Sequence, residues 1–309
     1  MKVLLANPRG FCAGVDRAIE IVERAINKTD GPVYVRHEIV HNRHVVDRLQ
    51  KKGAIFVEEP TDAPRNSRLI YSAHGVSPAI REAARKRNLD VTDATCPLVT
   101  KVHKEVERMK KDGYEIIMIG HAGHVEVEGT MGHAPDSMHL VETADDVARL
   151  EIKNHTKLGC VTQTTLSVDD TQEVMVALKK RFPDIKLPRQ DDICYATQNR
   201  QNAVKELAKT CELVLIVGAP TSSNSNRLVE VAVKLGAKSH LITSAEEINP
   251  QWIEGIECVG VSAGASTPEV LVEGVIQTLT DMAGPDTERT SLPKVDEGMH
   301  FKLPRELRD

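Results

Sequence analysis

Residues 96–126 read CPLVTKVHKEVERMKKDGYEIIMIGHAGHVE, and this stretch contains the pattern that decides the fold. The cysteine is followed by apolar residues at the spacing of one helix face, which are Val99, Val102, Val106 and Met109. Residues 114–119 then form a nearly continuous apolar run, which is typical of a buried parallel strand. A polar loop, GHAGHVEVE, follows this run. The stretch therefore predicts a helix, a strand and a polar loop in that order.

The same pattern occurs twice more, after Cys12 and after Cys194. Each of these cysteines precedes a helical pattern and then an apolar run, at residues 32–35 and 213–217, and the loops that follow read HEIVHN and GAPTSSNSN. The positions 30 residues beyond the three cysteines all fall in these loops, and they are Asn42, Glu126 and Asn224. This shared spacing predicts an internal threefold repeat.

A second strand and loop come later in every unit, and they read LIYSAHGVSP, GCVTQTTLSV and VGVSAGASTP. We expect a helix after each of these loops, capped by Ser77, Ser167 or Thr267. Further helices are expected over residues 43–52 and 227–235, because each of these segments ends at a glycine.

These patterns predict an α/β fold of three similar units around a pseudo-threefold axis, each a small parallel sheet with helices on both faces. We expect the first unit at residues 14–96, the second at 97–193 and the third at 194–281, completed by the N-terminal strand of residues 1–13, with a C-terminal tail at 282–309. Ligands of such sheets bind beyond the carboxyl ends of the strands. The polar loops would therefore face one central cavity. The alternative is ordinary α/β alternation with a chance spacing of cysteines.

The three repeated cysteines are candidate metal ligands. A cysteine at a helix N-terminus has its thiolate stabilised by the helix dipole. Three thiolates from three loops fit an iron–sulfur cluster that leaves one iron without a protein ligand. An open zinc site with three ligands, or three buried thiols, would also account for them. We expect the other three cysteines, Cys160, Cys211 and Cys258, to be plain buried thiols.

The polar loops contain many imidazole, hydroxyl and amide donors, which suit a phosphate or diphosphate that is bound and later released. These residues are His41, His74, His124, Thr164, Thr165, Ser222, Ser223, Asn224 and Ser266. Glu126 lies two residues after His124, where burial beside an anion would raise its pKa and suit it to proton donation. Glu126 could instead be a surface residue, as in a loop that also contains Glu128.

Two short motifs match catalytic signatures of unrelated enzyme classes. Residues 37–41 read HEIVH, a zinc-protease signature, but that mechanism needs both histidines on one helix, and here the motif follows a strand. Residues 260–264 read GVSAG, which matches the nucleophile elbow of α/β-hydrolases, but the only histidine after Ser262 is His300 in a polar tail. The repeat instead predicts that both stretches are parts of ligand loops.

Composition excludes several classes of function. Aromatic residues make up 3% of the chain and the formal net charge is -5, which argues against a nucleic-acid-binding surface. The apolar runs are too short to span a membrane. The apolar run in the opening stretch MKVLLANPRG is also too short for a signal peptide. We therefore expect a cytoplasmic enzyme.

Several stretches together resemble one enzyme family. They read LLANPRGFCAGVDRAI, VRHEIVHN, SAHGVS, DATCPLVTKVH, IGHAGHVEVEGT, QTTLSVDDT, DDICYAT, SSNSNRL and GVSAGAS. They resemble the 4-hydroxy-3-methylbut-2-enyl diphosphate reductases, which catalyse the last step of the non-mevalonate isoprenoid pathway. The resemblance extends from about Met1 to residue 281.

The resemblance implies three α/β domains around one 4Fe–4S cluster, held by Cys12, Cys96 and Cys194. It implies that an allylic diphosphate is bound by His41, His74, His124, Ser222, Ser223, Asn224 and Ser266. Glu126 and Thr164 would relay a proton while two electrons and two protons remove the allylic hydroxyl. The electrons would come from an external donor such as ferredoxin or flavodoxin, because the chain has no nucleotide-binding fingerprint.

Two other functions fit the same pattern. A non-redox lyase that resembles quinolinate synthase would share the threefold plan with three cysteines. An iron–sulfur sensor that binds a partner would catalyse nothing, but the many donors of the polar loops argue against it.

Overall fold

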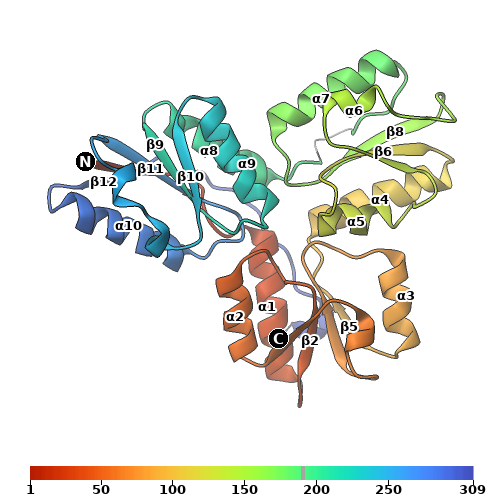
Figure 1. Cartoon of the computed structure of the whole chain (residues 1–309). Helices are drawn as coiled ribbons and strands as arrows, with labels where there is room; N and C mark the ends of the chain where they lie inside the picture. Colours follow the sequence, from red (N-terminus) through yellow and green to blue (C-terminus); the bar gives the residue numbers. More distant parts are fainter. Residues whose placement is uncertain (189–191, 309) are drawn as a thin grey trace. The chain divides into compact units, whose positions relative to one another are not determined.

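The computed structural model describes residues 1–188 and 192–308, which form three parallel sheets covered by helices (Figure 1). This confirms the α/β fold with small parallel sheets. The described chain divides into two compact units. The first contains Met1–Val15, His41–Val45 and Tyr195–His300, and the second contains Asp16–Val40, Val46–Cys194 and the residues from Phe301 onward. The boundaries of the three expected domains, and a cavity common to them, stay predictions.

The first compact unit contains a five-stranded sheet of order β10–β9–β11–β1–β12, in which all neighbours are parallel. Its strands are β1 (Lys2–Leu5), β9 (Leu213–Val217), β10 (Lys238–Ile242), β11 (Cys258–Ala263) and β12 (Glu288–Ser291). Alternate strand residues enter two apolar clusters, so helices cover both faces. One face packs against α10 (Glu269–Ala283), and the other packs against α8 (Tyr195–Ala208) and α9 (Ser223–Lys234).

The second compact unit contains two sheets. The four-stranded sheet has the order β3–β2–β4–β5 and the three-stranded sheet has the order β7–β6–β8, and all pairs are parallel. Their strands are β2 (Val33–Arg36), β3 (Ala54–Val57), β4 (Arg68–Tyr71), β5 (Asp90–Asp93), β6 (Glu115–Ile119), β7 (Met138–Val141) and β8 (Leu158–Thr162).

Helices cover both of these sheets. In the four-stranded sheet α3 (Pro78–Lys86) lies on one face, while α1 (Ala13–Lys28) and α2 (Arg43–Lys51) lie on the other (Figure 1). In the three-stranded sheet, Ile116 and Met118 pack against α4 (Pro97–Lys111) and α5 (Val125–Met131). The alternate residues Ile117 and Ile119 pack on the other face, against α6 (Ala144–Val147) and α7 (Val168–Arg181).

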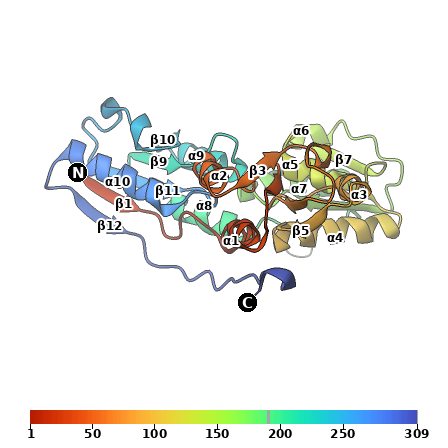
Figure 2. The same ribbon diagram turned by 90° about the horizontal axis from the view of Figure 1, so that it is seen from below.

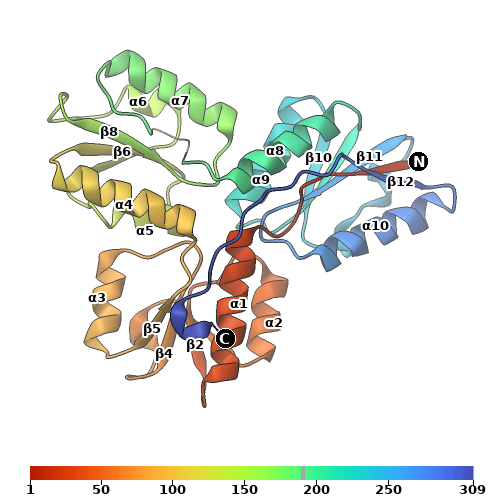
Figure 3. The same ribbon diagram turned by 180° about the vertical axis from the view of Figure 1, so that it is seen from behind.

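The C-terminal tail, for which the sequence suggested no structure, makes two ordered contacts. Its strand β12 pairs with β1 at the edge of the five-stranded sheet (Figure 2). Its last turns lie along α1 (Figure 3). There Arg17, Arg24 and Lys28 donate hydrogen bonds to backbone carbonyls of the tail at 2.9, 3.1 and 3.0 Å. These contacts fix the tail to α1, the helix that begins directly after Cys12.

Three elements differ from the expectations. Helix α9 begins at Ser223, four residues before the expected start, because the polar residues of the loop form its cap and first turn. The seven-residue helix α5 was not expected, since it is too short to show an apolar period. Thr267 does not cap α10, because its hydroxyl donates to Val217 O at 2.9 Å and Pro268 occupies the N-cap.

The 16-residue helix α1 is amphipathic rather than uniformly apolar. Among the described residues no helix has both the length and the apolar character that a membrane-spanning segment requires.

Candidate functional site

The three repeated cysteines occupy equivalent places in the structure. Cys12, Cys96 and Cys194 each stand directly before the first residue of a helix, which is α1, α4 or α8. All three are half-buried, whereas the other three cysteines are buried. A thiolate at a helix N-terminus is stabilised by the helix dipole. The structure therefore separates the three candidate ligands from the three structural thiols.

The backbone of each of these cysteines is bound to one of the second polar loops. The N–H of Cys12 donates to Ala265 O at 3.3 Å, that of Cys96 to Ala73 O at 2.9 Å, and that of Cys194 to Thr164 O at 2.9 Å. The three acceptors follow strands β11, β4 and β8, which lead into the second polar loops. The hydrogen bonds therefore couple each candidate ligand to the loop in which polar donors were predicted.

Glu126 and Thr164 are in direct contact. The Thr164 N–H donates to Glu126 Oε1 at 2.7 Å, and the Thr164 hydroxyl donates to Oε2 at 3.1 Å. Glu126 is 4% exposed, so it is not the surface residue that the sequence allowed as an alternative. Burial raises the pKa of Glu126 to about 7, with a smaller contribution from Asp192, although both Thr164 bonds oppose the shift. A carboxyl group with this pKa holds a proton near neutral pH and can release it.

Two of the candidate histidines lie near this carboxyl group. His124 caps α5, where its Nδ1 accepts a hydrogen bond from Glu126 N at 3.1 Å. A neutral ring whose Nδ1 accepts carries its proton on Nε2, so that nitrogen is a donor. The His74 ring lies 6.2 Å from the His124 ring, nearly perpendicular to it. The next candidate, Thr165, accepts a hydrogen bond from Gln163 Nε2 at 3.0 Å.

The candidates of the first compact unit lie around the start of α9. Ser222 is the N-cap and accepts a hydrogen bond from Ser225 N at 3.3 Å, while Ser223 and Asn224 form the first turn. The side chain of Asn224 is 4% exposed, and neither its amide nitrogen nor its oxygen has a hydrogen-bond partner among the described residues. Such a group is costly to bury. An anion at the helix N-terminus would satisfy the amide nitrogen.

Gly264 shows why the third unit has no side chain at the position of His74 and Thr164. A Cβ atom at Gly264 would lie 2.1 Å from Ser225 Oγ and 3.5 Å from Asn224 Nδ2. In the other two units, a side chain of the second polar loop, His74 or Thr164, occupies the equivalent position. Here the first turn of α9 occupies the space instead. The hydroxyl of Ser266 donates to His41 O at 3.0 Å. This bond joins the second polar loop of the third repeat to the first polar loop of the first repeat.

The first polar loops share one further feature. Each loop ends in a helix N-terminus, at α2, α5 or α9, and the capping residues are Asn42, His124 and Ser222. The free N–H groups of a helix N-terminus attract anions. Backbone donors therefore supplement the side chains in every unit.

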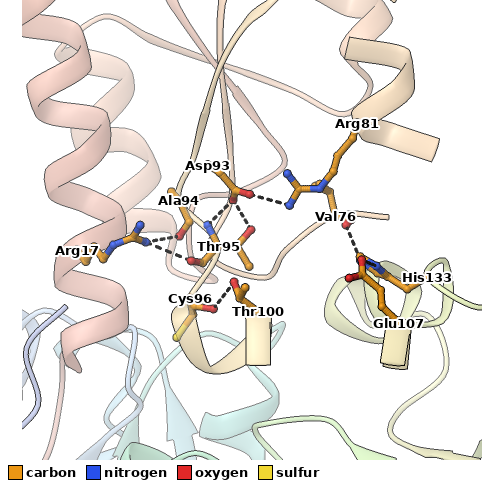
Figure 4. A network of polar contacts seen from close by, with 10 residues as sticks. All are labelled: Arg17, Val76, Arg81, Asp93, Ala94, Thr95, Cys96, Thr100, Glu107 and His133. Atoms are coloured by element: carbon orange, nitrogen blue, oxygen red, sulfur yellow. Dashed lines mark hydrogen bonds and ion pairs between the residues drawn. The ribbon is translucent and has the colours of Figure 1, made fainter. Parts of the chain in front are cut away.

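His103 and His133 were not selected from the sequence, but they support the His74 loop. Their rings lie 4.2 Å apart, and His133 Nε2 donates to Val76 O at 3.3 Å (Figure 4). Burial lowers the pKa of His103 to about 3, so this ring is neutral. At Gly75 (φ +82°) a Cβ atom would lie 2.6 Å from the His103 ring, so only glycine lets the loop approach α4 this closely.

Arg200 was also missed, and it holds the loop before Cys12. It is fully buried, and its guanidinium donates to Gly10 O at 2.7 and 3.0 Å and to Phe11 O at 3.0 Å. Glu297 of the C-terminal tail lies 3.1 Å from Arg200 and balances its charge. No motif marks either residue, because a buried arginine is recognised only from its partners.

Neither short motif has the local structure that its enzyme class requires. Residues 37–41 lie between the end of β2 and the start of α2, so they form no helical zinc site. Ser262 lies inside β11 and is fully buried, so it occupies no nucleophile elbow.

Comparisons with known proteins extend over nearly the whole chain. The family model described as LytB protein matches residues 3–280. A 4-hydroxy-3-methylbut-2-enyl diphosphate reductase from Dechloromonas aromatica is 58% identical over 307 residues, which cover 99% of this chain and 100% of that protein. The protein of the same name from Methylococcus capsulatus is 57% identical over 311 residues, with coverages of 100% and 99%.

Two solved structures are also similar. The E-1-hydroxy-2-methyl-but-2-enyl-4-diphosphate reductase from Plasmodium falciparum has a TM-score of 0.93 and 40% identity, and the match covers 99% of this chain and 96% of that one. An (E)-4-hydroxy-3-methyl-but-2-enyl diphosphate reductase, described as the terminal enzyme of the non-mevalonate pathway, has a TM-score of 0.65 and 34% identity, with coverages of 91% and 99%.

Proposed function

The chain belongs to the LytB family, and we propose that it is a 4-hydroxy-3-methylbut-2-enyl diphosphate reductase. The reaction removes the allylic hydroxyl of the substrate with two electrons and two protons. It yields isopentenyl or dimethylallyl diphosphate and one water. The observation that carries the proposal is the buried Glu126–Thr164 pair, because it provides a protonated carboxyl group beside the imidazole of His124.

We propose that Cys12, Cys96 and Cys194 hold one 4Fe–4S cluster. The residues fit this group, because all three are half-buried thiols at helix N-termini, where the thiolate form is favoured. When bound, such a cluster transfers electrons one at a time and offers a Lewis-acidic iron that has no protein ligand. The hydrogen bonds from the cysteine N–H groups to the second loops would fix the thiolates relative to the substrate donors.

The remaining candidates bind the diphosphate in this proposal. His74, His124 and Thr165 lie in the second compact unit. His41, Ser222, Ser223, Asn224 and Ser266 lie in the first. Neutral donors and helix N-termini bind an anion without the permanent charge of a lysine, which favours release of the product. The amide of Asn224 is the clearest candidate donor to a phosphate oxygen, since it is buried without a partner among the described residues.

Glu126 delivers the proton that converts the leaving hydroxyl into water. Its pKa of about 7 leaves about half of the molecules protonated at neutral pH, and the Thr164 bonds hold its two oxygens in place. A general acid works best when its pKa lies near the working pH. The Thr164 hydroxyl donates to Glu126 and also has lone pairs, so it can pass a proton between Glu126 and the substrate oxygen.

The electrons come from an external donor such as ferredoxin or flavodoxin, and the enzyme works in the cytoplasm. The test is anaerobic purification followed by iron, sulfide and spectroscopic analysis. The allylic diphosphate is then added with dithionite and methyl viologen. We expect about one four-iron cluster per chain and two electrons consumed per product. Loss of water from the substrate without electron consumption, to give a dehydrated product instead of isopentenyl or dimethylallyl diphosphate, would favour the lyase alternative. No product from a fully loaded protein would refute the proposal.

A further inference from the structure

The exposed face of α4 carries a row of cations that the proposed reaction does not use. Lys101, Lys104, Arg108 and Lys111 are spaced by three, four and three residues, so they share one face of the helix, and all four are exposed. With a rise of 1.5 Å per residue, the row extends about 15 Å along the helix axis.

A groove of about 690 Å³ lies beside this row. Three of the four row residues line it together with Arg17, and two carboxylates, Asp93 and Glu105, also contribute. The groove reaches the residues on both sides of Cys96, because Thr95, Pro97 and Thr100 belong to its lining. It therefore connects the cationic row with the backbone that presents a proposed cluster ligand.

The carboxylates of the groove are already paired. Asp93 accepts a hydrogen bond from Arg81 at 2.7 Å (Figure 4), and Glu105 is paired with Arg108. Within the described part of the chain, Lys101 and Lys104 make no ion pair. The positive charges of Lys101 and Lys104 therefore remain available to an anionic partner.

Arg17 adds a cation that is fixed in position. Its guanidinium donates to Ala94 O at 3.3 Å, to Thr95 O at 3.1 Å and, through Nε, to Lys302 O at 2.9 Å. Figure 4 shows it directed at the carbonyls that precede Cys96. Three bonds to neutral carbonyls hold this charge at the end of the groove nearest the cysteine.

Helix stability does not account for the row. Arg108 and Lys111 lie in the last turn of α4, where cations interact favourably with the helix dipole. Lys101 and Lys104 lie in the first half of the helix, where the dipole does not favour them, and at a spacing of three residues they repel each other. Neither the helix dipole nor an ion pair among the described residues therefore accounts for these two lysines.

We propose that the α4 row and its groove are the docking surface for the external electron donor, an acidic one-electron carrier protein. The inference rests on the proposed function, because electrons are needed here only if Cys96 holds the cluster. The formal net charge of -5 would repel an acidic carrier as a whole, so a local cationic row is needed to attract and orient it. A row about 15 Å long on an open helix face fits a protein surface better than a single phosphate.

The test compares two double variants of the holoenzyme with the same change in charge. Lys101→Glu/Lys104→Glu reverses the row. Lys180→Glu/Lys294→Glu is the control, since both of these lysines are exposed and Lys180 lies on α7, which covers the opposite face of the sheet from α4. The affinity for oxidised, acidic flavodoxin is measured by calorimetry at low and high ionic strength. Turnover is measured with reduced flavodoxin and, separately, with dithionite and methyl viologen.

We expect flavodoxin affinity and flavodoxin-driven turnover to fall by about tenfold or more in the row variant at low ionic strength. The difference should shrink in high salt, because salt screens exposed charges. The control should stay within about twofold, and dithionite-driven turnover should be unchanged in both variants.

Unchanged flavodoxin affinity in the row variant would overturn the docking surface. An equal loss of flavodoxin-driven and dithionite-driven turnover would also overturn it, because the effect would then lie in the reaction rather than in docking. Lys101→Gln/Lys104→Gln removes the positive charges without adding negative ones. It is used in place of Lys101→Glu/Lys104→Glu if the charge-reversal variant does not fold. If the wild-type protein forms no product with dithionite and methyl viologen, the proposed function is refuted. The flavodoxin affinities of the variants would still test the docking surface.

Discussion

Glu126→Gln tests the proposed proton donor most directly. Glutamine is nearly isosteric with glutamate, so its amide oxygen can still accept the 2.7 Å hydrogen bond from Thr164 N. What disappears is the ionisable proton. General acid catalysis contributes about 10² to 10⁴ in rate, so kcat/KM at pH 6 should fall by about that factor. The cluster spectrum should persist, because no cysteine is changed.

The pH dependence of kcat/KM gives a second quantity that can be predicted. Glu126 acts as an acid only while it is protonated, and its pKa is about 7. The protonated fraction is about 0.9 at pH 6 and about 0.1 at pH 8, from the titration of a single group. Wild-type activity is therefore present below the pKa and is lost as the pH rises through it. The ratio of wild-type to Gln-variant kcat/KM should fall about tenfold between pH 6 and pH 8.

The ratio is the useful quantity, because titration of the substrate diphosphate affects both proteins equally. Anaerobic steady-state assays at several pH values give it directly. Glu128→Gln is the matched control, since Glu128 lies two residues further along α5 and is exposed. It should leave kcat/KM within about twofold at every pH. A Glu126→Gln variant within about threefold of wild type at pH 6, or a ratio that does not change with pH, would refute the reasoning.

Three further predictions follow from the same site. Thr164→Val removes the hydroxyl bond but keeps the backbone bond, so the pKa of Glu126 should rise and the basic limb of the kcat/KM profile should move to higher pH; kcat should also fall, because the hydroxyl that passes the proton is lost, whereas Thr164→Ser should retain the wild-type profile. Asn224→Ala should weaken diphosphate binding by about 1.5–3 kcal/mol in calorimetry. The free energy of unfolding should not change, because the side chain has no hydrogen-bond partner among the described residues. A lower free energy of unfolding with unchanged diphosphate affinity would contradict the proposed role. Cys194→Ser should abolish the cluster in iron and sulfide analysis, whereas Cys160→Ala should keep it, and equal iron content in both would refute the ligand assignment.

The main elements could be predicted because buried apolar periodicity leaves a strong pattern. The apolar run at residues 213–217 coincides with β9, and the helical patterns after the three cysteines correspond to α1, α4 and α8. The repeat also marked the loops that contain Glu126 and Thr164. Their contact could not be predicted, since the repeat places the two residues in the two polar loops of one unit without showing that one hydrogen-bonds to the other.

The features that the sequence did not reveal depend on contacts rather than on periodicity. Strand β12 is largely exposed and has no apolar pattern, so only its backbone pairing with β1 identifies it. Helix α5 contains Gly129 and has seven residues, too few for a period. The clamp of Arg200 on the loop before Cys12 depends on three backbone carbonyl contacts and on Glu297, which is 97 residues away in the chain.

The hydrogen bonds of the second compact unit join three predicted roles in one chain. Cys194 N donates to Thr164 O at 2.9 Å, Thr164 N donates to Glu126 Oε1 at 2.7 Å, and Glu126 N donates to His124 Nδ1 at 3.1 Å. The proposed metal ligand, proton donor and diphosphate donor are thus linked by three hydrogen bonds. The donors are backbone N–H groups, but two of the acceptors are side-chain atoms, Glu126 Oε1 and His124 Nδ1. Glu126→Gln keeps an oxygen that can accept the bond from Thr164 N, so it tests the chemistry of the carboxyl group while the geometry of its neighbours is retained. A substitution at Thr164 leaves all three bonds in place, because Thr164 takes part in them only through its backbone.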